Sequence, residues 1–429
     1  MLSFNELNDT LFQLQFRLLT IMHKQIVSNI FWLIAEKIIT IILVFYVEGV
    51  IARLLSQQDY GKWIYSINLV LLLSSLSLIV GAEVLVPTLS KHKKITDSLL
   101  FNTFIIRLVF GFFASFCTFI YANFFVTDIV LKSFLSALAL VLLLNEPFGV
   151  VTSYFQSKVN ILPVTIVRII ALGVRALVAT VILKWALSID YIPWSRILEA
   201  ITSAIGLSLL YIIYKGKIRF NFSKKISKIL FYRGLLLWPS LMMMYFFQRI
   251  DRFFIEHYLS FDYLALYGIS VQIIEQATLL FGMVIQSIAP IFIFNRMSDA
   301  ERFGKLNRII MLMVGLSILS IIVGYFLIPF FIQLVYGKSY FGAIAITIGL
   351  LPSLLFFSVD TVLTQYFYAK NLGSKLIYKW IVMAIVTCIS YWLCLGVLQF
   401  KSAVLVFNIN YLIMLVITVI LFKKFIYEK

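Results

Sequence analysis

The stretch IIMLMVGLSILSIIVGYFLIPFFIQLVYG, residues 309–337, decides the fold class because it carries no charged side chain. A helix of about 20 apolar residues is long enough to cross the hydrocarbon core of a bilayer. Three more uncharged stretches of this kind lie at Trp63–Ala82, Trp380–Phe400 and Ser402–Phe422. The whole chain is 62% hydrophobic and 13% charged, whereas soluble proteins have about 25% charged residues. These proportions exclude a soluble enzyme.

Windows of about 20 apolar residues indicate twelve membrane spans. They lie at 28–50, 63–87, 99–124, 130–151, 161–184, 197–214, 235–257, 263–292, 308–333, 341–367, 376–400 and 402–422. Backbone groups inside lipid must be hydrogen-bonded within the protein, so a span is either a helix or a strand of a closed barrel. The runs are too long and too continuous for the alternating strands of about ten residues that form a barrel. The sequence therefore predicts an all-α, polytopic integral membrane protein.

Lysine and arginine are distributed unevenly among the connections. The termini and the even-numbered loops hold 23 of the 36, the odd-numbered loops hold 7, and the others lie within spans. Basic residues accumulate on the cytoplasmic side of a membrane protein. We therefore expect both termini in the cytoplasm, with anionic membrane lipids beside the basic loops. This distribution explains the net charge of +17 better than nucleic-acid binding does.

The most basic connection divides the chain near its middle. Residues 215–234 carry seven basic and no acidic side chains, and we interpret them as a cytoplasmic linker between six-helix bundles at 28–214 and 235–429. An ordinary solvated loop is the alternative. Leu55–Gly61 resembles Leu259–Tyr263 at the end of the first span of each half, as in transporters built from repeats. Residues 1–27 are expected to be a cytoplasmic segment, either an amphipathic helix on the membrane or a partly ordered tail.

Groups that carry enzyme chemistry are scarce in this sequence. No predicted loop is long enough to form a reaction chamber outside the membrane. The three histidines and three cysteines lack the spacing of a metal site or a disulfide framework. There is no phosphate-binding loop for ATP. We therefore expect a protein that is not an enzyme, holds no metal or cofactor, and transports its substrate by movement of its helices.

Ionisable side chains inside the spans are costly in lipid, so each is a candidate functional residue. Arg168 and Arg175 lie two turns apart on one face of the fifth span, and Arg249 and Arg252 share a face of the seventh. Together with Lys37 of the first span, we expect them to line a cationic, hydrated cavity suited to phosphate or acidic sugars. The alternative is that such residues form interhelical ion pairs, for example Arg249 with Glu275, or extend to the head groups.

Four acidic residues in the spans are candidates for binding a coupling proton or sodium ion. They are Asp360, Glu275, Asp251 and Glu36. Arg107 and Glu146 lie nearer the ends of their predicted helices, so we expect a structural role for both.

Several motifs, in this order and spacing, resemble one family. They are IARLLSQQDYG at 51–61, YFQSK at 154–158, WPS at 238–240, RIDR at 249–252, ALYG at 265–268 and YGKSY at 336–340. The chain is similar over nearly its whole length to Wzx-type polysaccharide flippases of the multidrug/oligosaccharidyl-lipid/polysaccharide exporter superfamily. The extra N-terminal segment departs from the family's pattern.

The resemblance implies a fold and a function. The fold is two six-helix bundles arranged in a V about a central cavity, with pseudo-two-fold symmetry. The function is to move an undecaprenyl-pyrophosphate-linked oligosaccharide repeat unit across the bacterial cytoplasmic (inner) membrane, for O-antigen, capsule or exopolysaccharide assembly. Arg249 and Asp251 correspond to an Arg and an Asp of the family's seventh span, and Arg53 to its Arg at the end of the first, so we also expect Arg53 among the substrate-binding residues of the cavity. A polysaccharide polymerase and a chain-length regulator are the expected partner proteins.

The resemblance also implies a mechanism. The cavity opens inward, its basic residues hold the pyrophosphate and sugars, and the two halves rock to expose the head group outside. Three alternatives stay open. A multidrug or organic-cation exporter shares the fold but favours an acidic, aromatic cavity. A peptidoglycan-precursor flippase usually has two more helices. A membrane glycosyltransferase, polymerase or ligase needs a long extracytoplasmic loop.

Overall fold

The computed structural model describes residues 36–158, 160–216, 220–292, 299–370, 372–398 and 402–427. Within these ranges the chain forms helices and turns and no β-strand, so the all-α prediction is confirmed. The N-terminal segment predicted at 1–27 and the beginning of the first predicted span lie outside the described residues.

The first half of the chain begins with a helix at residues 36–54. The helices that follow are α2 (Gln57–Ser77), η1 (Leu78–Val80), α3 (Ala82–Lys91), η2 (Lys93–Ile95), α4 (Thr96–Phe124), α5 (Ile129–Phe148), α6 (Val150–Ser157), α7 (Leu162–Lys184), η3 (Ile189–Tyr191) and α8 (Ile192–Lys215).

The second half begins with α9, which is longer than its predicted span. Its helices are α9 (Lys224–Tyr258), α10 (Phe261–Phe292), α11 (Asp299–Val335), η4 (Lys338–Tyr340), α12 (Gly342–Leu350), α13 (Ser353–Ala369), η5 (Gly373–Lys375), α14 (Leu376–Tyr391), η6 (Trp392–Val397), α15 (Ala403–Phe422) and η7 (Lys423–Tyr427).

Eleven helices in the described ranges are long and apolar enough to cross a membrane. They correspond in order to the second through twelfth predicted spans. The first predicted span is described only from residue 36, where its helix continues to residue 54. The predicted linker is helical over much of its length, because α8 continues to Lys215 and α9 already begins at Lys224. Ser223 supports this early start of α9, since its hydroxyl caps the helix by accepting from the N–H of Ile226.

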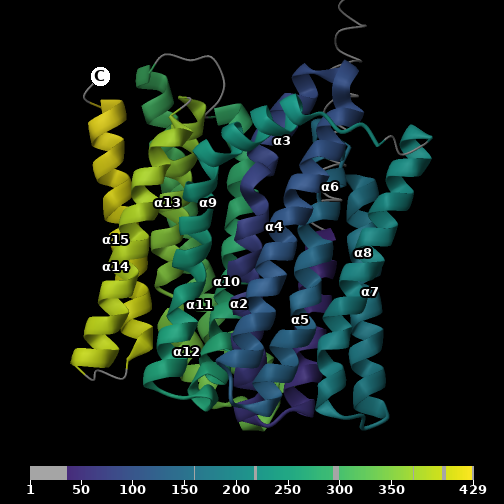
Figure 1. The fold of residues 1–429 in the computed structure, drawn as a ribbon. Helices are drawn as coiled ribbons and strands as arrows, with labels where there is room; N and C mark the ends of the chain where they lie inside the picture. The colour runs from purple at the N-terminus through teal and green to yellow at the C-terminus, as the bar shows by residue number, and fades with distance from the viewer. Residues whose placement is uncertain are drawn as a thin grey trace, which may run out of the picture.

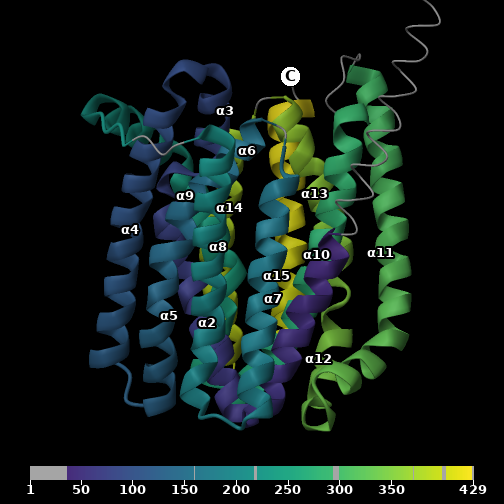
Figure 2. The same cartoon turned by 90° about the vertical axis from the view of Figure 1, so that its right-hand side faces the viewer.

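Successive spans run in opposite directions. In Figures 1 and 2, α3, α6 and the C-terminus lie at one end of the molecule, which we call the upper end, and α12 lies at the opposite, lower end. The connections α3–α4 and α6–α7 are therefore at the upper end, whereas α4–α5 and α7–α8 are at the lower end. In the first half α4 packs on α5 and α7 on α8. In the second half α9 packs on α14, and α13 on α15.

The two halves meet most closely where α2 packs against α10 near the lower end. A Cβ at Gly61 of α2 would lie 1.9 Å from the carbonyl oxygen of Phe261, so only glycine permits this approach. Beside it, the rings of Tyr60 and Tyr340 meet edge to face, 5.5 Å apart, and the Tyr340 hydroxyl donates to the carbonyl of Ala52 at 2.9 Å. Close packing thus closes the lower end between the halves.

Candidate functional site

A cavity of about 770 Å³ lies between the two halves of the molecule. Helix 36–54 contributes Glu36, Thr40, Val44 and Glu48, which recur every four residues and so share one face, and Lys37 beside Glu36. Helices α2, α5, α7, α8, α9 and α10 supply most of the remaining wall. Its volume falls within the ~300–1,000 Å³ that ligand pockets usually have.

The cavity reaches further towards the upper end than towards the lower end. Gln156, one of its lining residues, lies next to the upper end of α6. At the other extreme the lining includes Arg196, four residues after the start of α8, and Ile64 and Gly268, which pack against each other in the contact of α2 with α10. The cavity is therefore closed towards the lower end.

Charged side chains of both signs line the cavity. Among the described residues, the basic ones are Lys37, Arg107, Arg168, Arg175, Arg196, Arg249 and Arg252, and the acidic ones are Glu36, Glu48, Glu83, Glu146, Glu199 and Glu275. The balance of charge is closer to neutral than the cationic cavity that we expected from the sequence. Glu36 and Glu199 lie within three residues of a basic lining residue in the sequence, whereas the other four carboxylates are more distant from any of them.

Four of these residues form a row of ion pairs that we call the first network: Glu48, Arg175, Glu199 and Arg196. Arg175 Nη2 lies 2.5 Å from Glu48 Oε1, and its Nη1 lies 3.6 Å from Glu199 Oε2. The same Glu199 oxygen is 3.4 Å from Arg196 Nη1. At the inner end of the row, Glu48 also accepts from the Trp63 indole at 3.2 Å. Helices 36–54, α7 and α8 are thereby joined.

The second half of the chain contains a matching row, the second network: Asp251, Arg252, Glu275 and Arg249. Arg252 lies between two carboxylates, 2.8 Å from Asp251 Oδ1 and 2.6 Å from Glu275 Oε1. Glu275 Oε1 also lies 2.9 Å from Arg249 Nη1. At the inner end, Asp251 accepts from the Tyr267 hydroxyl at 2.7 Å. This row joins α9 to α10.

The two networks have the same order of charges and the same gradient of exposure. Each runs from a buried carboxylate through a buried arginine to a second carboxylate and a second arginine at the cavity. The inner arginines, Arg175 and Arg252, have side chains 1% and 3% exposed, whereas Glu199 and Glu275 are 24% and 30% exposed. A hydrogen bond of 3.0 Å from Arg249 Nη1 to Asn68 Oδ1 on α2 links the second network to the first half of the chain.

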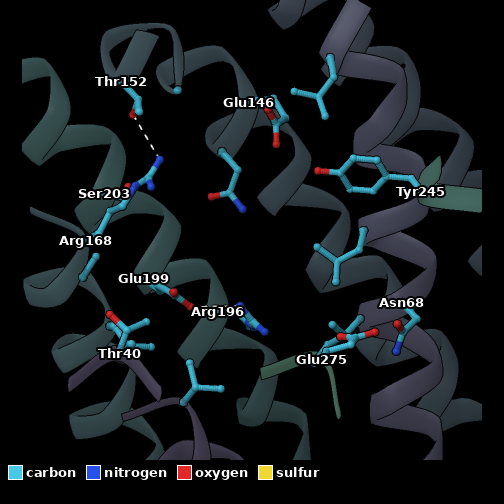
Figure 3. Close-up of a pocket in the computed structure, with 18 of the residues that line it drawn as sticks. Thr40, Asn68, Glu146, Thr152, Arg168, Arg196, Glu199, Ser203, Tyr245 and Glu275 are labelled. Carbon is cyan, nitrogen blue, oxygen red and sulfur yellow. Dashed lines mark hydrogen bonds and ion pairs between the residues drawn. The ribbon is translucent and has the colours of Figure 1, made fainter. Parts of the chain in front are cut away.

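Nearer the upper end, the charged residues of the cavity are not ion-paired within the described part of the chain. Arg168 donates to the Thr152 hydroxyl at 3.4 Å, and Lys37 lines the cavity one residue from Glu36. Figure 3 shows Arg168 and Thr152 on one side of the opening and Glu146 and Tyr245 on the other. Arg107 is different, because it donates to the backbone carbonyls of Val80 and Glu146 and so holds α4 against its neighbours.

Seven of the ten predicted site residues line this one cavity: Lys37, Arg168, Arg175, Arg249, Arg252, Glu275 and Glu36. The other three lie elsewhere. Arg53 donates to the carbonyl of Leu334 near the lower end, and Asp251 lies behind Arg252. Asp360 of α13 is buried within the second half, where Lys379 contacts both of its oxygens at 2.7 and 2.6 Å. The anticipated Arg249–Glu275 pair is present as well.

Sequence reasoning missed Arg196, Glu199 and Asn68. Arg196 counted as a loop residue because the sixth predicted span began at 197. The helix begins earlier, with Pro193 in its first turn, where proline is favoured. The spacing of Arg196 and Glu199, three residues apart, was the available signal for an ion pair on one helix face. No signal in the sequence indicated that Asn68 faces Arg249.

Two solved structures share this fold. A multidrug resistance MATE family transporter of the MOP superfamily, in an inward-facing conformation, aligns with a TM-score of 0.69 at 10% identity over 89% of this chain and 94% of that one. The lipid II flippase MurJ, in an inward closed conformation, aligns with a TM-score of 0.73 at 13% identity over 91% of this chain and 87% of that one. At these identities the likeness concerns the fold, a twelve-helix transporter architecture.

A family described as polysaccharide biosynthesis protein matches residues 50–345. No curated protein sequence matches the chain significantly. The family match covers most of the chain, including the second ion-pair network, the first network apart from Glu48, and the packed contact between the halves. The chain belongs to the polysaccharide biosynthesis protein family.

Proposed function

We propose that this protein is a flippase that moves an undecaprenyl-pyrophosphate-linked oligosaccharide from the inner to the outer face of a bacterial cytoplasmic membrane. The observation that carries the proposal is the cavity of about 770 Å³ between the halves, lined by charged side chains at the depth of the membrane spans. The polysaccharide biosynthesis family supports a glycan substrate. O-antigen, capsule or exopolysaccharide assembly is the proposed destination, with a polymerase and a chain-length regulator as partners.

The physical reason is the cost of moving a polar head group through lipid. Transferring an ionised group to hydrocarbon without partners costs tens of kcal/mol by simple solvation estimates. A cavity lined with charged and amide groups replaces much of the water that the head group loses, while the polyprenyl tail stays in the bilayer. The closed lower end and the cavity reaching the upper end support an inward-open state. Rocking of the halves would then open the lower end.

Orientation follows from the basic loops. The connections richest in lysine and arginine belong to the upper end, so we propose that this end faces the cytoplasm, together with both termini. The cavity would then receive its substrate from the side on which lipid-linked sugars are made.

Arg168 and Lys37 are the proposed pyrophosphate-binding residues. No carboxylate lies within ion-pair distance of either in the described part of the chain, so their donors are available to phosphate oxygens. The two ion-pair networks would contact the sugars deeper in the cavity. Arg53 would hold the lower end closed through its bond to Leu334. Glu275, Asp251 and Asp360 are already ion-paired with basic side chains. Among the four candidates for binding a coupling proton or sodium ion, we therefore favour Glu36.

The proposal can be tested with the purified protein in liposomes that contain a fluorescent polyprenyl-pyrophosphate oligosaccharide. Arg168→Gln removes a charge-assisted contact and is expected to lower the initial rate of flipping by about tenfold or more, because such contacts contribute ~1.5–3 kcal/mol. Lys228→Gln, on the exposed beginning of α9 outside the cavity, is the matched control. A folded wild-type protein that moves no lipid-linked oligosaccharide would refute the proposal.

A second candidate is an exporter of organic cations. Glu83 and Glu146 favour it, because both line the upper part of the cavity and neither is ion-paired among the described residues. The family match argues against it. Transport of a cationic dye, without flipping of the lipid-linked glycan, would support the exporter function and refute the flippase function.

A further inference from the structure

We propose that the deep part of the cavity selects an uncharged glycan, and that Glu199 and Glu275 set this preference. The inference rests on the proposed flippase function and adds the chemical class of the sugars. It follows from the composition of the two ion-pair networks, whose members Glu199 and Glu275 line the same cavity from opposite halves of the molecule (Figure 3).

Each network has a formal charge of zero. Glu48 and Glu199 offset Arg175 and Arg196 in the first network. In the second, Asp251 and Glu275 offset Arg252 and Arg249. The deep arginines are therefore not free cations waiting for an anion. In each network, two carboxylates of the protein are already paired with the guanidinium groups. A carboxylate on the incoming glycan would therefore find no unpaired guanidinium group there.

The outer members of each network suit hydroxyl groups. Arg196 and Glu199, like Arg249 and Glu275, present a donor and an acceptor side by side at the cavity. A sugar hydroxyl has one donor and two acceptor sites, so it can bond to both members at once. The Nη2 atoms of Arg196 and Arg249 donate to no other described residue, which leaves donors for sugar oxygens.

The charge at Glu199 and Glu275 is held at fixed points of the scaffold. Glu199 lies between Arg175 and Arg196, and Glu275 between Arg252 and Arg249, so neither carboxylate can turn away from the cavity without breaking two ion pairs. Two unit charges ~8 Å apart at an effective dielectric constant of ~20–40 interact by ~1–2 kcal/mol. Repulsion of that size offsets the attraction of the neighbouring guanidinium groups, so an acidic sugar loses hydration in the deep cavity without a net electrostatic gain.

The experiment compares two substrates in proteoliposomes: a polyprenyl-pyrophosphate oligosaccharide of neutral sugars, and the same compound with one hexose replaced by a uronic acid. The wild-type protein is expected to flip the neutral compound faster. Glu199→Gln and Glu275→Gln each leave a network with one excess positive charge, so each should lower the neutral-to-acidic ratio of rates by about tenfold. Asp262→Asn, at the exposed beginning of α10, removes the same charge outside the cavity and should leave the ratio unchanged.

A double variant separates charge from the loss of a particular side chain. Arg196→Gln with Glu199→Gln returns the first network to zero charge and should restore the preference for the neutral compound. The inference is overturned if the wild-type protein flips the acidic compound as fast as the neutral one, or if both single variants flip the substrates with an unchanged ratio. Failure of the wild-type protein to move either compound would instead refute the flippase function on which the inference rests.

Discussion

Lys379 offers a quantitative test of how the second half of the molecule is held together. Its side chain on α14 is fully buried, and Nζ lies 2.7 and 2.6 Å from the two carboxylate oxygens of Asp360 on α13. Thr418 of α15 donates to the same carboxylate at 2.6 Å. Lys379→Met removes the positive charge, fills a similar volume, and leaves the buried Asp360 carboxylate without its ion-pair partner. Removing one partner of a buried ion pair costs ~3–5 kcal/mol.

We therefore expect Lys379→Met to lower the free energy of unfolding by ~3–5 kcal/mol. The measurement is an SDS titration in mixed micelles at pH 7, followed by tryptophan fluorescence. Lys215→Met is the matched control, because Lys215 makes the same kind of pair with Asp97 at 3.0 Å, but their side chains are 29% and 23% exposed. Such a pair contributes ~0–1 kcal/mol.

The double variant Lys379→Met/Asp360→Asn completes the test. It removes both charges together, so it should recover most of the stability that the single variant loses. A Lys379→Met protein within 1 kcal/mol of the wild type would refute the reasoning, as would a double variant no more stable than the single one. Either result would mean that the pair of Asp360 with Lys379 contributes little to stability, and would return Asp360 to the candidates for ion coupling.

Two further predictions follow from the packing and from the basic loops. Gly61→Ala places a Cβ 1.9 Å from the carbonyl oxygen of Phe261, so we expect α2 and α10 to separate and the thermal unfolding temperature in detergent to fall. Gly173→Ala, whose Cβ meets nothing within 4 Å, should unfold as the wild type does, and equal unfolding temperatures for both variants would contradict the close approach. Reporter fusions after residues 222 and 261 should report opposite compartments, the first cytoplasmic, and the same compartment for both would show that the orientation derived from the basic loops is wrong.

Ion pairing accounts for the main difference between the expected and the observed cavity. The sequence contains basic residues inside the predicted spans, and we expected them to line a shared cationic cavity. The alternative was that such residues form interhelical ion pairs, for example Arg249 with Glu275. The structure contains both features, because Arg175, Arg249 and Arg252 line the cavity and are also paired with carboxylates. Among the predicted cationic residues that line the cavity, only Arg168 and Lys37 have no such partner in the described part of the chain.

The amino-acid sequence by itself determined the spans, their order and the uneven distribution of basic residues. These properties are local, because the length and hydropathy of a single helix decide whether it crosses a bilayer. Only the tertiary structure decided which ionisable residues meet. Glu48 and Arg175 are 127 residues apart in the sequence, and Asp360 lies away from the cavity because Lys379 and Thr418 engage it inside its own half. The rotation of each helix about its axis, and the identity of its neighbours, depend on packing between distant segments, to which a hydropathy pattern is insensitive.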